Sequence, residues 1–337
     1  MSSLSHDVLA DRARGCLLGL AVGDALGRPV ETLEPAQIRA EFGRLTELLP
    51  DADGQVSGTD DTEYAVFVAI LLDRHGRDLS PAHVADAWRA ALVPRETLGA
   101  AGFSELAAVL NLARGWDPPH TGRHRHSWSD GLAMRAAPYG VYAAGQPDMA
   151  ARLAMVDGTV SMDGEGIHGG CAVAAAVAVA MTGAAPARVA EAARAAVPAD
   201  SWLARTLARA TEVAAGGARG DALTEALHDA VVPRFYPFSD LAPEAVALAV
   251  GAYLAADGDV EESVVNAVNL GRDADTIGAI AGALAGAGRG RDAVPTRWAD
   301  QIGPLTGACV DDVVGRHPTD AADLVAAAAL RDGMWTA

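Results

Sequence analysis

Apolar residues recur along most of the chain with the spacing of buried or amphipathic helices, and no run alternates apolar and polar positions for more than a few residues. Ala and Leu dominate these segments, whereas strands favour β-branched and aromatic residues. The pattern therefore predicts an all-α protein. The predicted helices cover residues 9–27, 64–72, 82–92, 98–114, 134–144, 147–157, 171–181, 185–197, 201–215, 220–231, 243–256, 259–270, 276–287 and 318–331.

Three stretches interrupt the helical pattern. Residues 30–57 are more polar and less periodic, residues 116–130 read as one long polar loop, and residues 158–170 are rich in glycine and read as a second loop. No linker of low complexity divides the chain, and no internal repeat is found. We therefore expect residues 1–337 to form a single domain.

Two of the predicted helices carry glycine at every fourth position. The first has Gly15, Gly19 and Gly23, and the second has Gly278, Gly282 and Gly286. Residues four apart lie on one face of a helix, and a face without side chains lets another backbone approach closely. The two helices are thus predicted to pack closely, so that the segments at their ends meet.

Two acidic motifs each open an apolar helix: Thr59-Asp60-Asp61-Thr62 and Asp273-Ala274-Asp275-Thr276. An acid at a helix start is usually an N-cap, and Asp60 followed by Glu63 also fits a capping box. A cap needs only one acid, however, so each motif has a second acid and a threonine to spare. Oxygen-only groups suit Mg²⁺, Mn²⁺ or Ca²⁺ rather than zinc, and two such half-sites could hold two ions about 3.5–4 Å apart.

The composition narrows the partners and the compartment. The chain has 44 acidic and 26 basic residues, all of the latter Arg, and its formal charge of -18 argues against a nucleic-acid polymer as partner. Three scattered cysteines indicate neither a disulfide framework nor a zinc site. The longest apolar run, residues 171–181, is shorter than the roughly 20 residues of a membrane span, and the charged N-terminus does not resemble a signal peptide. We expect a cytoplasmic protein with no membrane partner.

Four motifs together resemble the ADP-ribosylglycohydrolase family, which includes dinitrogen reductase-activating glycohydrolases and ADP-ribosyl-acceptor hydrolases. They are Gly19–Glu31 (GLAVGDALGRPVE), Thr59–Thr62 (TDDT), Met134–Gly140 (MRAAPYG) and Gly271–Gly282 (GRDADTIGAIAG). They occur in the family's order and spacing. The resemblance covers the chain from about residue 10 to about residue 300.

This resemblance implies a compact, orthogonal multi-helix bundle with a binuclear Mg²⁺ site in a central cleft, where Mn²⁺ could substitute. Metal ligands are expected at the matching positions Thr59, Asp60, Asp61, Asp273, Asp275 and Thr276. The acid at the end of the first motif, Glu31, would lie on a mobile loop over the metals and act as general base or stabilise a cationic sugar. The catalytic residues implied are Glu31, Asp60 and Asp61.

The chain departs from the family pattern at two places. Many members carry Thr-His where this chain has Ser161-Met162, and the usual second glycine of the last motif is Arg272. Both departures leave the metal ligands intact and bear on the substrate. Arg272 could pair with Asp273, contact a substrate phosphate or point outward. The residues predicted to bind substrate are Ser161, Asp163, Gly164, His168 and Arg272.

The predicted function is Mg²⁺-dependent hydrolysis of an N- or O-glycosidic bond at a ribose anomeric carbon, most simply removal of ADP-ribose from a modified protein. One alternative is hydrolysis of a nucleoside or another small ribosylated metabolite on the same metals. A second alternative is a non-catalytic, crystallin-like protein that only binds metal. The complete set of predicted ligands favours the enzyme.

Overall fold

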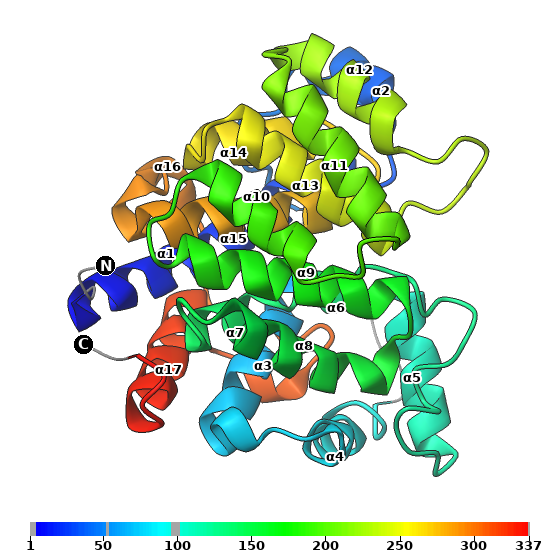
Figure 1. The fold of residues 1–337 in the computed structure, drawn as a ribbon, viewed down its shortest axis with the longest axis vertical. Helices are drawn as coiled ribbons and strands as arrows, with labels where there is room; N and C mark the ends of the chain where they lie inside the picture. The colour runs from blue at the N-terminus through cyan, green and yellow to red at the C-terminus, as the bar shows by residue number, and fades with distance from the viewer. Residues whose placement is uncertain (1–4, 52–53, 96–101, 336–337) are drawn as a thin grey trace.

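The protein is a bundle of α-helices (Figure 1), seen in a computed structural model that describes residues 5–51, 54–95 and 102–335. Over these ranges no β-strand forms, and one isolated antiparallel bridge joins Ser129 to Leu241. The α-helices are α1 (His6–Gly27), α2 (Pro35–Phe42), α3 (Asp60–His75), α4 (Pro81–Ala91), α5 (Phe103–Ala113), α6 (Gly131–Met134), α7 (Ala137–Tyr142), α8 (Pro147–Ser161), α9 (Glu165–Ala180), α10 (Pro186–Ala195), α11 (Trp202–Ala215), α12 (Gly220–Val231), α13 (Ala242–Ala255), α14 (Val260–Val268), α15 (Ala274–Arg289), α16 (Thr296–Ala299) and α17 (Pro318–Arg331).

The predicted all-α class is confirmed, and most predicted helices coincide with observed ones to within a few residues. Residues 98–101 of the predicted helix 98–114 lie outside the described residues, and the remainder forms α5. The sequence pattern missed α2, which lies within the polar stretch 30–57. This helix buries only one residue, Ile38, so it leaves almost no apolar periodicity in the sequence.

The prediction of a loop over residues 158–170 was wrong. Helix α8 continues to Ser161 and α9 begins at Glu165, so only residues 162–164 connect them. The glycines here provide space inside packed helices instead of flexibility. A Cβ added at Gly158 or Gly170 would lie within 3.0 Å of the Leu132 side chain. Glycine content alone does not distinguish such a helix from a loop.

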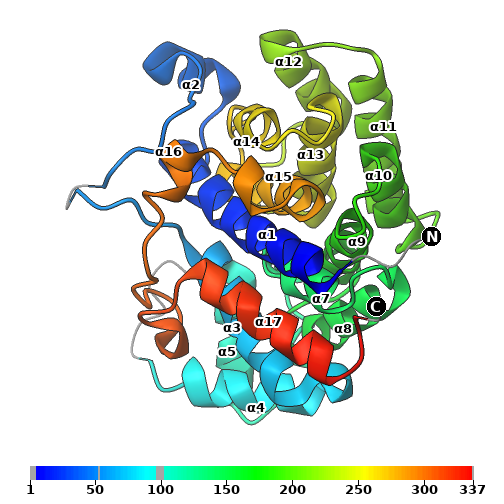
Figure 2. The ribbon, with the colours of Figure 1, turned by 90° about the vertical axis from the view of Figure 1, so that its left-hand side faces the viewer.

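Helices α1 and α15 form the centre of the fold, with α13 and α14 on one side and α3 and α17 on the other (Figure 2). Their glycines face each other, as the spacing predicts. A Cβ added at Gly19 would lie within 3.0 Å of the Gly282 carbonyl, and one added at Gly278 would lie as close to the Gly23 carbonyl. The two backbones are therefore in direct contact, which brings the end of α1 beside the start of α15.

The buried apolar side chains form one continuous core that extends from Leu9 to Trp335. It is built mainly from Ala, Val and Leu, in keeping with the low aromatic content of 5%. No helix among the described residues is both long and apolar enough to cross a membrane. The cytoplasmic location stays a prediction.

The contact between α1 and α15 predicts an unusual effect of the substitution Gly19→Ala. In the interior of a helix, alanine is normally more favourable than glycine by about 1 kcal/mol. Here the added methyl group would overlap the Gly282 carbonyl, so we expect the free energy of unfolding to fall by about 1–3 kcal/mol. Urea denaturation measures this difference through the midpoint and slope of the transition.

Gly303→Ala is the matched control, because no atom lies within 4 Å of a Cβ added there. We expect it to change the free energy of unfolding by no more than about 0.5 kcal/mol. Equal effects of the two substitutions would contradict the close approach of α1 and α15.

Candidate active site and metal centre

A cavity of about 370 Å³ opens where the starts of α3, α5, α6 and α15 meet the segment that follows α1. Its lining is rich in oxygen atoms. The polar lining residues are Glu31, Thr32, Thr59, Asp60, Asp61, Ser104, Glu105, Ser129, Asp130, Ser239, Asp240, Arg272, Asp273, Asp275 and Thr276. All six predicted metal ligands and the predicted catalytic Glu31 are thus brought together in one place. The partial positive charge at the helix starts favours acidic side chains there.

The acids of the first motif do not cap α3. Thr59 is the N-cap, and its hydroxyl accepts a hydrogen bond from the Asp61 N–H at 3.4 Å. The capping-box alternative is therefore wrong. Glu63 instead accepts hydrogen bonds of 2.7–2.9 Å from three backbone N–H groups of residues 308–310. This arrangement leaves Asp60 at the cavity wall.

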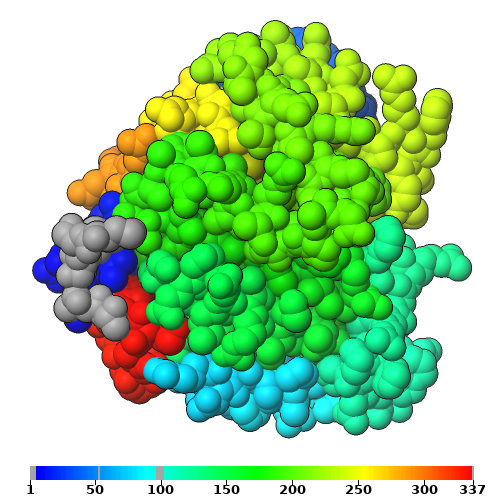
Figure 3. All heavy atoms as spheres, viewed as in Figure 1, coloured from blue at the N-terminus to red at the C-terminus, as the bar shows by residue number. Residues whose placement is uncertain are grey.

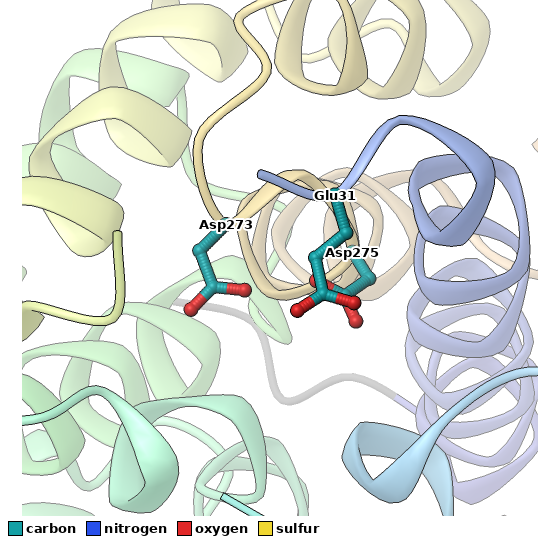
Figure 4. Close-up of side chains that lie close together, drawn as sticks. All are labelled: Glu31, Asp273 and Asp275. Carbon is teal, nitrogen blue, oxygen red and sulfur yellow. The ribbon is translucent and has the colours of Figure 1, made fainter. Parts of the chain in front are cut away.

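In the second motif, Asp273 occupies the N-cap position of α15, yet its side chain makes no capping hydrogen bond. Glu31, Asp273 and Asp275 instead offer carboxylate oxygens that all lie within 4.8 Å of one another. Figure 4 shows the three carboxylates directed into the same open space, two from the start of α15 and one from the segment after α1. Acids from opposite ends of the chain therefore form one cluster.

Burial and mutual repulsion make the cluster costly when no cation is near. Burial, followed by the Asp275 and Asp24 charges, raises the pKa of Glu31 to about 7. The pKa values of Asp60, Asp61 and Asp273 lie well above the ordinary range, mainly because of burial and secondarily because of neighbouring acids. Each carboxylate is therefore held in surroundings that oppose its charge.

The donor set fits a hard divalent cation. Asp61 Oδ1 and Asp130 Oδ2 are buried and have no hydrogen-bond partner among the described residues. A buried carboxylate oxygen without a partner is unfavourable unless a cation or a donor group reaches it. The cavity supplies many oxygen ligands and no thiol or imidazole, which is the chemistry that Mg²⁺ and Mn²⁺ prefer.

Asp24, near the end of α1, is a member of the site that the sequence analysis did not assign. The side chain is completely buried, and its two oxygens accept hydrogen bonds from the Thr59 N–H at 2.8 and 3.0 Å and from the Thr62 N–H at 3.1 Å. The Thr62 hydroxyl donates to it as well. Burial and the Asp275 charge raise the pKa of Asp24 to about 7. Asp24 thus joins α1 to the acidic motif of α3. Its sequence signals were an acid within a small-residue helix and its place in the Gly19–Glu31 motif.

Three further acids in the lining also escaped prediction: Glu105, Asp130 and Asp240. Glu105 is neutralised by Arg135, whose Nη1 lies 3.0 Å from its Oε1. Arg135 is itself buried and also contacts Asp157 at 2.9 Å. Asp130 and Asp240 add two more acids to the wall, and the Asp130 charge contributes to the raised pKa of Asp273.

Four of the predicted substrate-binding residues, all from residues 161–168, lie outside the lining of this cavity. The Ser161 hydroxyl is buried and accepts a hydrogen bond from Arg135 at 2.8 Å. Asp163 is exposed, 3.5 Å from Arg123. Gly164 has a φ of 53° just before α9, and His168 lies 3.4 Å from Glu165. The contacts of Ser161, Asp163 and His168 are with residues outside the cavity lining, and the role of these four residues in substrate binding stays a prediction.

Arg272, the fifth residue predicted to bind substrate, does line the acidic cavity. Its guanidinium pairs with Glu244 of α13, with Nε 2.6 Å from Oε1 and Nη2 3.3 Å from Oε2. Nη2 also donates to the Phe238 carbonyl at 2.8 Å. The three arrangements considered from the sequence did not include a pair with Glu244. Such a pair joins distant parts of the chain and becomes visible only in the tertiary fold.

A second cavity of about 310 Å³ adjoins the first, and Ser129 and Asp240 line both. Its other lining residues are Arg125, His126, Trp128, Trp202, Tyr236 and Leu241. The Trp128 and Trp202 rings pack edge to face, with centroids 6.4 Å apart. Trp128 is 47% exposed, so its ring is accessible to a ligand. The yellow-green segment between α12 and α13, which carries Tyr236, stands out at the upper right of the molecule in Figure 3.

Comparison with known proteins gives consistent matches over nearly the whole chain. The sequence profile described as ADP-ribosylglycohydrolase matches residues 5–332. An uncharacterized protein of Archaeoglobus fulgidus is 34% identical over 303 residues, which is 87% of this chain and 92% of that protein. The uncharacterized protein YegU of Escherichia coli is 26% identical over 304 residues, or 84% and 89% of the two chains.

A solved structure described as an ADP-ribosylglycohydrolase-related protein complex is also similar. It superposes with a TM-score of 0.68 and is 27% identical, and the match covers 96% of this chain and 99% of the other. The similarity thus extends over nearly the whole chain.

The crowded acids predict how stability depends on pH and on Mg²⁺. Because folding raises the pKa of Asp24 and Glu31 from about 4 to about 7, the folded chain binds more protons than the unfolded chain between these values. The free energy of unfolding of the metal-free protein should therefore fall as the pH rises through this window. Mg²⁺ should raise the melting temperature more at about pH 8 than at about pH 5.5, because protons compete with it for the carboxylates.

Thermal denaturation at the two pH values, with EDTA or with excess Mg²⁺, measures this effect. Asp275→Asn should abolish most of the Mg²⁺-dependent shift, whereas Glu47→Gln, an exposed acid paired with Arg297, should retain it. Equal shifts in the two variants would show that Mg²⁺ acts elsewhere on the protein.

Proposed function

The chain belongs to the ADP-ribosylglycohydrolase family, and on this premise we propose that it is a Mg²⁺-dependent hydrolase that removes ADP-ribose from a modified protein. One observation carries the choice of substrate: the acidic cavity adjoins a second cavity that contains tryptophan and tyrosine rings and an arginine. An ADP-ribosyl group has a ribose at the scissile bond and an adenosine at its far end. The two adjoining cavities offer one place for each.

The acidic cavity suits the scissile ribose. Two Mg²⁺ ions, or Mn²⁺ in their place, would be held by the oxygen atoms of Thr59, Asp60, Asp61, Asp273, Asp275 and Thr276. When bound, such ions orient hydroxyl groups of a sugar and lower the pKa of a nearby water molecule. The chain places Glu31 beside the same oxygens, where its carboxylate can accept a proton or stabilise positive charge at the anomeric carbon.

The aromatic cavity suits the adenosine half. The Trp128 ring offers a face for stacking against a nucleobase, and Arg125 lies in the same lining. A guanidinium recognises phosphate oxygens better than any other side chain, because its donors match them in pairs. A nucleoside would fill only one of the two cavities. The pair of cavities therefore favours an ADP-ribosyl substrate over a nucleoside.

A substrate panel tests this function. We expect the protein with Mg²⁺ to release ADP-ribose from peptides modified on Arg or Ser, measured by chromatography, and to act on nucleosides at least about 100-fold more slowly in kcat/KM. EDTA should abolish the activity, and added Mg²⁺ or Mn²⁺ should restore it. Faster hydrolysis of nucleosides would favour the small-metabolite alternative. Tight Mn²⁺ binding without hydrolysis of any substrate would favour the non-catalytic alternative.

The variant Glu31→Gln tests the role of the carboxylate after α1. The substitution preserves the size of the side chain but removes its charge and its ability to accept a proton. We expect kcat to fall by roughly 10²–10⁴-fold, the usual contribution of a general base, with a smaller change in KM. Glu47→Gln again serves as control and should keep the native kcat. A kcat for Glu31→Gln within about threefold of the native value would exclude Glu31 as the catalytic group.

A further inference from the structure

We infer that Arg272 is a positioning residue. It fixes two segments at the acidic cavity: the one after α1, which carries Glu31, and the loop between α12 and α13, which carries Phe238. This inference rests on the function proposed for the cavity. The Arg272 guanidinium donates its hydrogen bonds to other groups of the protein, so this role differs from direct contact with the substrate. The contacts of its backbone and of its side chain lead to the same conclusion.

The backbone of Arg272 pairs with the segment that carries Glu31. The Thr32 N–H donates to the Arg272 carbonyl at 2.6 Å, and the Arg272 N–H donates to the Leu33 carbonyl at 3.0 Å. These two hydrogen bonds join residues 32–33 directly to the residue before Asp273. The position of Glu31 relative to Asp273 and Asp275 therefore depends on the conformation at Arg272.

Residues other than glycine rarely adopt the backbone conformation found at Arg272. Arg272 has a φ of 60°, and the preceding Gly271 has a φ of 63°. Glycine would adopt the left-handed region without strain, whereas a residue with a Cβ does so at a cost. The arginine is thus unfavourable locally and must be stabilised by the contacts of its side chain.

Those contacts reach two more segments. The guanidinium forms a two-point ion pair with Glu244, whose side chain is fully buried on α13, and donates to the Phe238 carbonyl at 2.8 Å. Its Nη1 also lies 3.6 Å from Glu34. Glu244 is thus the anchor, while Glu34 and Phe238 belong to the two segments that line or border the cavity mouth.

The arrangement connects the acidic cavity with its aromatic wall. Phe238 lines the acidic cavity and contacts His126 of the second cavity, with ring centroids 5.9 Å apart. A shift of the guanidinium would therefore move Glu31 on one side and this ring on the other. Small displacements of groups around a reacting centre reduce rates strongly, so such a residue affects catalysis without touching the substrate.

The experiment compares Arg272→Gly, Glu244→Gln and the double variant. Glycine keeps the backbone conformation and removes the guanidinium. Arg272→Gly alone leaves the buried Glu244 charge without its partner, so we expect lower thermal stability. In the double variant, which has no buried charge at either position, stability should recover towards the native value. The exchange protection of the Thr32 amide and kcat/KM should not recover, each staying about tenfold or more below native.

Amide hydrogen exchange monitored by mass spectrometry over residues 30–34 and 236–240 gives the decisive readout, since it needs no substrate. Arg39→Ala is the control: Arg39 lies on the nearby α2 and pairs with Asp221 at the surface, 3.1 Å apart. It should change neither exchange nor kcat/KM.

Native exchange protection and native kcat/KM in the double variant would overturn the inference. An increase in KM with unchanged exchange would overturn it too, because it would make Arg272 a substrate-binding residue. If the native protein hydrolysed no ADP-ribosylated substrate, the proposed function would fail. The exchange comparison would still decide whether Arg272 positions the two segments.

Discussion

The candidate site depends on the contact between the backbones of α1 and α15. Glycines on both helices remove the side chains that would otherwise separate them, so Gly19 faces Gly282 and Gly23 faces Gly278. The contact sets the end of one helix beside the start of the other. Asp24 and Glu31, which belong to the N-terminal part of the chain, therefore reach Asp275 in the C-terminal part. No local feature of either helix would bring these acids together.

A cluster of like charges at such a junction is unfavourable unless hydrogen bonds or opposite charges stabilise it. The acids of this site differ in how many such partners they have. Asp24 accepts hydrogen bonds from the start of α3, and Glu105 is paired with the buried Arg135. Asp61 and Asp130 have less support, since each keeps a buried oxygen without a hydrogen-bond partner among the described residues. Asp24 and Glu105 are thus supported by protein groups, whereas the buried oxygens of Asp61 and Asp130 are places where a cation or a donor group would be stabilising.

Much of this organisation could be predicted from the sequence, and the exceptions have physical causes. Helical periodicity and the spacing of Gly15, Gly19 and Gly23 were sufficient to predict the fold class and the central helix pair. The loop expected at residues 158–170 was wrong because glycine marks close packing as well as turns. Pairings such as Asp24 with Thr59, or Arg272 with Glu244, join distant parts of the chain. They depend on tertiary geometry, for which a single sequence contains no local signal.

Substrate choice depends on the walls around the acidic cavity. A metal centre that handles only a ribose has no means of distinguishing what is attached at the far end of the substrate. That discrimination has to come from the walls, where Trp128 and Arg125 line the second cavity. Of the two departures from the family pattern, Ser161-Met162 lies at the end of α8, outside the lining of the acidic cavity, while Arg272 lies in its wall. Arg272 is therefore the departure that bears directly on the walls of the acidic cavity, through its contacts with the segment after Glu31 and with the Phe238 carbonyl.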